Sequence, residues 1–464
     1  MIFVVALTLL SGFLVTRLRI YLDFFELYPP RHPYIQLYQE YRKMFGGANV
    51  LVVVVETRQG TIFNFETIGK IDRITRFLMD SPGVDPTQVI SLTHPKLKTI
   101  DVSALGILIQ PVMFPSFPQN QADVDRMRDA VYRNRDIRGF FVSGDDRAAA
   151  IFAGFWEEGT DLRVFFERIR RLQAEQSDAN HRVYVTGYPM LFAWIVHYLP
   201  LVLVVMAVTA SSIAVLLWFY FRTWTGVWVP ILSATLSAVW ALGFAGLLGF
   251  TLNPLTLVVF VLITARALSH SVQSMERYHD EYRRLGDRTA AIMASYVALF
   301  PPATVSIAAD GLAILTLATA SIPLIQNLAY VSSFWVLTMA VSVVTLHPVL
   351  LSYLRPPGDD PKRGLRFSDT VYGSINLGLV RLSVGWPRYV LVAIFFVALG
   401  GGLFFARLLQ VGDTSVGKAL LYESHPYNRA FDFLNSKFVG SAQLVVIAEG
   451  DRPGAIQGRA VLEK

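Results

Sequence analysis

Long apolar runs alternate with mixed stretches along the chain. Seven runs are apolar enough to be predicted membrane helices, and they cover residues 1–16, 195–221, 226–249, 252–274, 302–321, 328–354 and 389–406. Most of them approach the roughly 20 residues that a helix needs to cross a bilayer. The first run is short, and we interpret it as an anchor because no small-residue cleavage site follows it. The pattern therefore predicts a membrane α-helical bundle with seven spans.

The polar stretches divide the chain between these spans. We predict span 1 in residues 1–20, an extramembrane domain in 21–194, spans 2–6 in 195–354, a linker in 355–388, span 7 in 389–408 and the start of a second extramembrane domain in 409–464.

The patterning within 21–194 predicts a folded α+β domain. Strands are expected at 50–55, 89–92 and 182–186, and helices with apolar spacing at 65–79 and 162–176. Segments 137–142 and 147–155 flank a polar Ser-Gly-Asp-Asp run and are expected to form a hairpin. The order βαβ–ββαβ predicts a ferredoxin-like sandwich.

One stretch of this domain fits no element well. Residues 106–118, with the sequence GILIQPVMFPSFP, are apolar and interrupted by prolines. Two interpretations stay open, namely buried packing and a loop that faces lipid or substrate.

An internal repeat relates the two ends of the chain. Residues 32–56 and 425–449 align without gaps at an offset of 393, share nine identities in 25 positions, and both open with His-Pro-Tyr. Span 7 therefore repeats span 1, and a second domain begins at 409. A repeat of this period predicts a unit of about twice this length, so we expect the sequence to be truncated at its C-terminus.

Composition and charge agree with a membrane protein. Apolar residues make up 53% and charged residues 16% of the chain, whereas a soluble protein is nearer a quarter charged. This excludes a disordered chain, a nucleic-acid-binding tail and an ordinary cytosolic enzyme. Basic residues gather in the 275–300 loop and the 355–388 linker, so these segments are predicted to be cytoplasmic and 21–194 to lie across the membrane. In a Gram-negative cell the protein would lie in the inner membrane, with this domain in the periplasm.

The order of one span, an external domain, five spans and a repeat resembles the resistance-nodulation-division (RND) superfamily. The likeness is strongest to its MmpL-like lipid exporters, whose spans 2–6 are similar to the sterol-sensing domain. Arg277-Tyr278 with Glu281 resembles the Arg-Tyr-x-x-Glu run of span 4, and Pro302, Thr304, Gly311 and Pro323 resemble the span 5 pattern. The resemblance implies a porter-type external domain, twelve spans in the complete unit and proton-driven export of hydrophobic molecules.

One departure from the family concerns the proton relay. The family usually carries a Gly-x-x-x-Asp-Tyr motif eight residues before the Arg-Tyr pair. Here Ser269 and His270 stand at the Asp and Tyr positions. The usual relay aspartate is therefore missing, which puts proton coupling through that site in doubt.

Charged residues inside the predicted spans are the candidate site. Span 4 carries Arg266 and His270, one helical turn apart with Ser269 beside them, and span 5 carries Asp310. Counting from the predicted cytoplasmic ends puts Arg266 and Asp310 at equal depth, so we expect an ion pair. Three interpretations stay open: a static bridge, a displaced relay with Asp310 as carrier and His270 as the group that passes protons to it, and an arginine that reaches the interface alone.

Other histidines are interpreted as structural. His347 precedes a proline near the end of span 6 and is expected to be a helix-end residue, and His32 and His425 are expected to cap helices. No metal spacing, nucleophile elbow or phosphate loop is present in the sequence, so we expect no cofactor and no enzyme activity.

Three functions remain open at this stage. The first is a transporter that exports lipid-like molecules. For it we expect periplasmic or outer-membrane partner proteins and a homo-oligomer, and we expect no nucleic-acid partner. The second is a protein-translocation accessory, and the third is a non-transporting sterol-sensing or receptor-like module.

Overall fold

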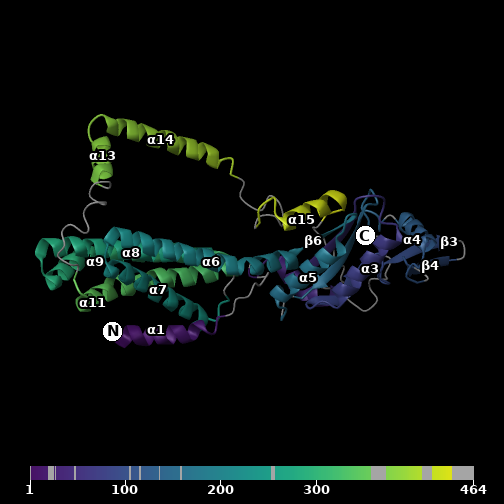
Figure 1. Ribbon diagram of the computed structural model, residues 1–464, viewed down its shortest axis with the longest axis horizontal. Coiled ribbons are helices and arrows are strands. Elements are labelled where there is room, and N and C mark those ends of the chain that lie inside the picture. Colours follow the sequence, from purple (N-terminus) through teal and green to yellow (C-terminus); the bar gives the residue numbers. More distant parts are fainter. Residues whose placement is uncertain are drawn as a thin grey trace. The chain divides into compact units, whose positions relative to one another are not determined.

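A computed structural model describes residues 2–18, 26, 28–45, 49–103, 106–113, 116–134, 136–156, 159–251, 257–356, 373–409 and 421–440. The chain divides into two compact units. Unit 1 comprises Met1–Tyr38 and Tyr198–Gly412, and unit 2 comprises Gln39–His197 and Asp413–Lys464. Unit 1 is helical, and unit 2 is built around a sheet (Figure 1).

Unit 1 is a bundle of long apolar helices. Its elements are α1 (Ile2–Val15), α6 (Tyr188–Phe221), α7 (Trp224–Leu247), α8 (Leu257–Leu285), α9 (Arg288–Leu315) with the 3₁₀ turn η3 (Thr316–Thr319), α10 (Pro323–Met339), the π-helical segment η4 (Ala340–Thr345), α11 (Leu346–Tyr353), α13 (Gly373–Ser383) and α14 (Pro387–Ala406). The N-terminal end of α6 belongs to unit 2. Helices α8 and α10 both pack against α7 and α9.

Five helices among the described residues are long and apolar enough to cross a membrane. They begin at Tyr188, Trp224, Arg288, Pro323 and Pro387. Helix α1 is apolar but short, and α8 is long but is not among the five. The membrane character is therefore supported, while the count of seven spans stays a prediction.

Several prolines lie inside the long helices. Span 5 was predicted to begin at 302, but α9 begins 14 residues earlier, so Pro301 and Pro302 lie inside the helix. Pro200 and Pro230 also lie inside their helices. An interior proline leaves the carbonyl oxygen four residues earlier without its helical N–H partner.

Helix α1 lies close against α7 because glycines leave room for it. A Cβ on Gly246 would lie 2.3 Å from the Leu14 carbonyl oxygen, and one on Gly243 would lie 2.5 Å from Ser11 Cβ. The indole N–H of Trp240 donates to the Thr8 hydroxyl at 2.9 Å. Such close contact through small residues is typical of helix packing in membranes.

Unit 2 contains a four-stranded antiparallel sheet in the order β2-β5-β1-β6. The strands are β1 (Val50–Thr57), β2 (Val84–Ile90), β5 (Ala148–Phe155) and β6 (His181–Thr186). Helix α3 (Phe65–Met79) joins β1 to β2, and α5 (Leu162–Gln176) joins β5 to β6. The central strands are almost fully buried, as expected for a strand covered on both faces.

Two segments of unit 2 differ from the sequence prediction. Residues 137–142 form turns and isolated bridges instead of a strand, because Arg138 and its neighbours bond to the adjacent 143–146 turn. Residues 106–111 form strand β4 (Gly106–Pro111), which pairs with β3 (Lys98–Ser103) in a separate hairpin. Its Ile107, Leu108 and Ile109 are exposed, whereas Val112 is buried, so the buried-packing interpretation is wrong for the strand itself.

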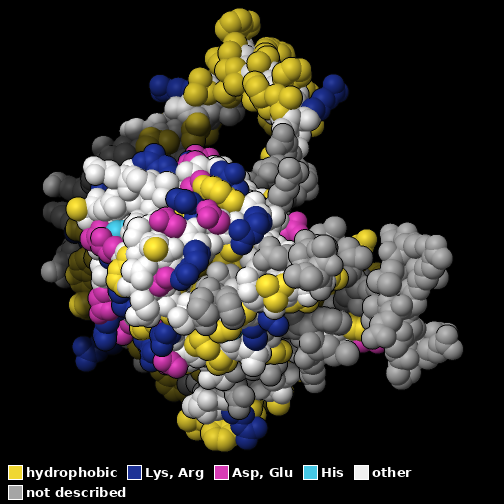
Figure 2. Space-filling model, turned by 90° about the vertical axis from the view of Figure 1, so that its right-hand side faces the viewer, with side chains coloured by type: hydrophobic (Ala, Val, Ile, Leu, Met, Phe, Trp, Pro, Cys, Tyr) yellow, Lys and Arg dark blue, Asp and Glu magenta, His cyan; other side chains and the backbone are white. Residues whose placement is uncertain are grey.

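Helix α4 (Gln121–Arg133) of unit 2 carries mixed charge and was not predicted. Basic and acidic side chains are interspersed over the face of the molecule that Figure 2 shows. A mixture of both signs creates no extended field of one sign over this face.

The sequence repeat is visible in two helices. Helices α2 (Pro33–Phe45) and α15 (Pro426–Lys437) begin at equivalent prolines. In each, the backbone N–H of the tyrosine after the proline donates to the histidine Nδ1, at 3.3 Å for His32 and 3.1 Å for His425. Both histidines therefore cap a helix as expected. Residues 444–447, which the alignment pairs with the predicted strand residues 51–54, lie outside the described residues.

Candidate functional site

The charged residues of the predicted spans meet between α8 and α9. Arg266 Nε and Nη2 both donate to Oδ2 of Asp310, at 2.9 and 2.7 Å, and Nη2 lies 3.5 Å from the Ser306 hydroxyl. Two N–H groups on one carboxylate oxygen form a directional, charge-assisted contact. The structure thus brings together the two residues for which the sequence predicted equal depth.

The remaining two candidates lie on the same helix as Arg266. His270 is half-buried one turn further along α8, and its Nε2 is buried without a hydrogen-bond partner among the described residues. Ser269, at the position of the missing aspartate, is exposed. Neither residue bonds directly to the ion pair, so their predicted roles stay predictions.

The pair lies on the surface of the described bundle. The Arg266 side chain is 47% exposed and that of Asp310 is 35% exposed. Lipid tails cannot hydrogen-bond to such groups, so charges within spans usually face protein or a water-filled space. The arrangement places a carboxylate next to a permanent cation at the surface of the bundle.

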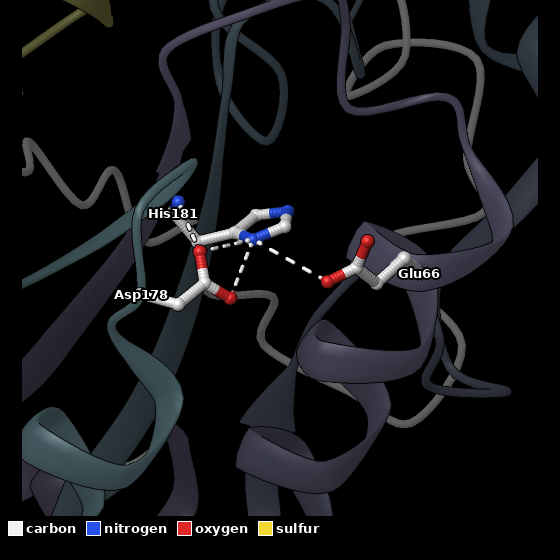
Figure 3. A group of neighbouring side chains, drawn as sticks. All are labelled: Glu66, Asp178 and His181. Atoms are coloured by element: carbon white, nitrogen blue, oxygen red, sulfur yellow. Dashed lines mark hydrogen bonds and ion pairs between the residues drawn. The ribbon is translucent and has the colours of Figure 1, made fainter.

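A second cluster of titratable groups lies in unit 2, where Glu66, Asp178 and His181 converge (Figure 3). His181 Nδ1 lies 3.0 Å from Asp178 Oδ1 and 3.8 Å from Glu66 Oε1. On its other side, His181 Nε2 lies 2.8 Å from the Thr67 hydroxyl. One imidazole and two carboxylates are ligands that a divalent cation accepts, so the cluster is a candidate metal site.

A lysine ammonium group already lies against the carboxylate that would bind a metal ion in this cluster. Lys70 Nζ lies 2.8 Å from Asp178 Oδ2 and donates to the Gln176 carbonyl oxygen at 3.3 Å. The hydrogen bond from Lys70 holds the Asp178 pKa well below its usual value, and bonds from the backbone and ring of His181 lower it further. The cluster therefore fits a self-neutralised structural network that joins α3 to the turn before β6, better than a metal site.

A third set of contacts holds α15 against the sheet within unit 2. Phe433 stacks on Tyr184 with ring centroids 4.2 Å apart, and Lys437 Nζ lies 2.6 Å from Asp145 Oδ2. Burial raises the Asp145 pKa, but hydrogen bonds from Lys437 and Ser143 outweigh it, so the pKa falls to about 2. The first helix of the second repeat is thus fastened to the domain of the first repeat.

The sequence did not indicate how deeply His347 is buried. It was expected to be a helix-end residue, but it is fully buried where the π-helical segment η4 meets α11. Nothing in a single sequence distinguishes the two positions, because both have an apolar neighbourhood and a following proline.

Two comparisons with known proteins agree with this architecture. The MMPL family matches residues 36–392, which includes both the α+β domain and the helices of the bundle. A protein of Methanocaldococcus jannaschii that is named as a membrane protein, MJ1562, is 20% identical over 364 residues, which cover 76% of this chain and 89% of that protein. The chain is therefore an RND-like membrane protein and belongs to the MMPL family.

Proposed function

We propose that this protein is a secondary transporter of the inner membrane that exports hydrophobic or lipid-like molecules, driven by the proton gradient. The observation that carries the proposal is the Arg266–Asp310 pair between two apolar helices. Ionisable groups at membrane depth are costly and mark ion or substrate pathways by default. Family membership supports the transporter class, and the substrate and the driving ion are our own inference.

The external domain supports the same proposal. Its strand order β2-β5-β1-β6, with two β-α-β units interleaved, supports a ferredoxin-like arrangement. We propose that it is a porter-type domain on the periplasmic side. We also propose that further transmembrane helices cover the exposed side of the ion pair, either from the second repeat that α14 begins or from a second copy. A charged pair that faced lipid tails would lack hydrogen-bond partners there.

Charge exchange distinguishes a transport role from a static bridge. Asp310→Asn and Arg266→Gln should each destabilise the protein, by about 3–5 kcal/mol where the remaining charge is left in a low-dielectric site. The double variant Arg266→Asp/Asp310→Arg restores the pair and should restore folding. If the carboxylate carries protons, the folded double variant stays inactive, because the carboxylate now lies on α8. Exposed Ser211→Ala on α6 is the matched control.

The measurement uses the full chain in liposomes loaded with a pH-sensitive dye and a fluorescent phospholipid analogue. Wild-type protein should release the analogue only under an imposed proton gradient and should move protons as it does so. A charge-exchanged variant with wild-type transport would show that the pair is a structural bridge. Gradient-independent binding of the analogue without transport would favour the receptor-like alternative.

A further inference from the structure

Three buried polar residues, Ser233, Ser342 and His347, lie inside the bundle where η4 and α11 face α7, and we call them the seam. Ser233 of α7, Ser342 of η4 and His347 of α11 are each 0% exposed. Within the described part of the chain, the hydroxyls of Ser233 and Ser342 have no hydrogen-bond partner, and the His347 ring makes only a weak contact with the backbone of Val229. Buried polar groups without partners are rare and call for a specific explanation.

The positions of these groups place them along one interface. The ring of His347 faces the backbone of Val229 in α7, and Ser233 is one α-helical turn further along the same helix. Ser342 and His347 are five residues apart across the π-to-α junction, which corresponds to about one turn. Segment η4 itself packs against α7, so both serines and the histidine belong to the same seam.

Hydroxyls on the outer surface of the bundle behave differently. Thr209, Ser211 and Ser212 of α6 are exposed, and each donates to the carbonyl oxygen four residues earlier, at 2.9, 2.8 and 2.8 Å. A serine in an apolar helix commonly satisfies itself in this way. The buried Ser233 and Ser342 do not use their own helices, so their hydroxyls remain available to a ligand between the helices.

The π-helical segment lies next to the seam at this point. Pro348 has no backbone N–H, so it cannot bond to the carbonyl group of Val344. Segment η4 (Ala340–Thr345) ends just before this site and changes the helical register there. Single π-helical turns widen a helix locally and are frequent at functional sites. The next turn of the seam is closed, since Trp335 Nε1 donates to the Ser237 hydroxyl at 3.2 Å.

We infer that this seam is a binding site for internal water molecules. Water fits because it can donate to an imidazole nitrogen and accept from a hydroxyl, and a buried water needs two to four such partners. Lipid cannot supply these bonds at membrane depth. No carboxylate among the described residues forms a hydrogen bond or ion pair with the seam, so a neutral ligand fits better than a cation.

The seam is separate from the Arg266–Asp310 pair and does not depend on the proposed function. The pair joins α8 to α9 on the exposed side of the bundle, whereas the seam is buried against α7. Water-mediated bonds can break and re-form at little cost. A hydrated seam would therefore allow the helices that follow α10 to slide along α7, which a dry, interlocked interface resists.

Hydroxyl-radical labelling by X-ray radiolysis tests the inference, because internal water generates radicals next to the side chains it contacts. Trp335 and Trp240 form a matched pair, since they are 2% and 1% exposed. Trp335 lies beside the seam, while Trp240 bonds to Thr8 of α1. In the full chain, Trp335 and His347 should be labelled several-fold faster than Trp240. Equally slow labelling of all three would overturn the inference.

The sign of a stability change gives an independent test. If Ser342 binds water, Ser342→Ala removes a hydrogen bond and lowers the melting temperature, and Ser233→Ala does the same. If the seam is dry, each change removes an unsatisfied hydroxyl and raises the melting temperature. Ser212→Ala, on the exposed face of α6, controls for the serine-to-alanine change itself. A rise for both seam variants above this control would contradict the hydration site.

Discussion

Asp178 decides the stability of the α3–β6 corner at the scale of single residues. Its carboxylate pairs with Lys70, whose side chain is only 9% exposed, and accepts the backbone N–H of His181 at 2.7 Å. Asp178→Asn keeps the shape but leaves the Lys70 ammonium without its counter-charge. We expect a loss of about 1–3 kcal/mol in the free energy of unfolding of unit 2, measured by thermal melts. Exposed Asp125→Asn on α4 should change stability far less.

The pH dependence of this corner has a definite sign. The Asp178 pKa is lowered by folding from a usual value of 3.8, so its contribution is fully present above that value. It is lost as the pH falls below 3.8 towards the folded pKa, because the unfolded chain then binds the proton first. Wild-type protein should therefore lose stability in this acidic range faster than Asp178→Asn does. Parallel pH curves for the two proteins would rule out this role.

The candidate site was only partly predictable at the residue scale. Counting residues from the predicted span ends placed Arg266 and Asp310 at similar depth, because helical rise is uniform and charges in apolar runs are conspicuous. The hydroxyls of Ser233 and Ser342 gave no such signal. A serine in an apolar helix is usually satisfied by its own backbone, and only tertiary packing shows which ones are not.

At the scale of elements, helix α15 provides a direct comparison of apolar and ionic contacts. Leu434 is fully buried under this helix, whereas the Asp145 and Lys437 side chains are 37% and 39% exposed. Leu434→Ala should cost about 2–5 kcal/mol, and Asp145→Asn about 0–1 kcal/mol because water screens the pair. Trypsin should therefore cleave after Arg429 much faster in the leucine variant alone. Similar rates in both variants would mean that the ion pair holds the helix.

Amphipathic helices of unit 2 were predictable because their signal is local. The bounds of α3 and α5 agree with the sequence prediction to the residue, since each carries a clear apolar stripe and a polar N-cap. Segment 137–142 was wrongly predicted as a strand because it flanks the polar 143–146 run like one arm of a hairpin, while its bonds are those of a turn. The β3–β4 hairpin depends on pairing between two weak strands, which periodicity alone does not reveal.

At the scale of the whole molecule, the orientation in the membrane is the remaining expectation, and it depends on which loops carry basic residues. The chain has no cysteine, so single cysteines report on one position each. Ser143 would be a poor reporter because it is 0% exposed, and exposed Gln59 of unit 2 is suitable instead. Arg283, at the end of α8, is 54% exposed and reports on the predicted cytoplasmic side.

Impermeant maleimide applied to intact spheroplasts should label Gln59→Cys and leave Arg283→Cys unlabelled. Permeabilised cells should show labelling of both, which controls for accessibility of the two thiols. The reason is that the short basic loop after α8 resists translocation, whereas the mixed charge of unit 2 does not. Labelling of Arg283→Cys alone in intact spheroplasts would invert the topology. The α+β domain would then lie in the cytoplasm, which contradicts the proposed porter-type domain on the periplasmic side.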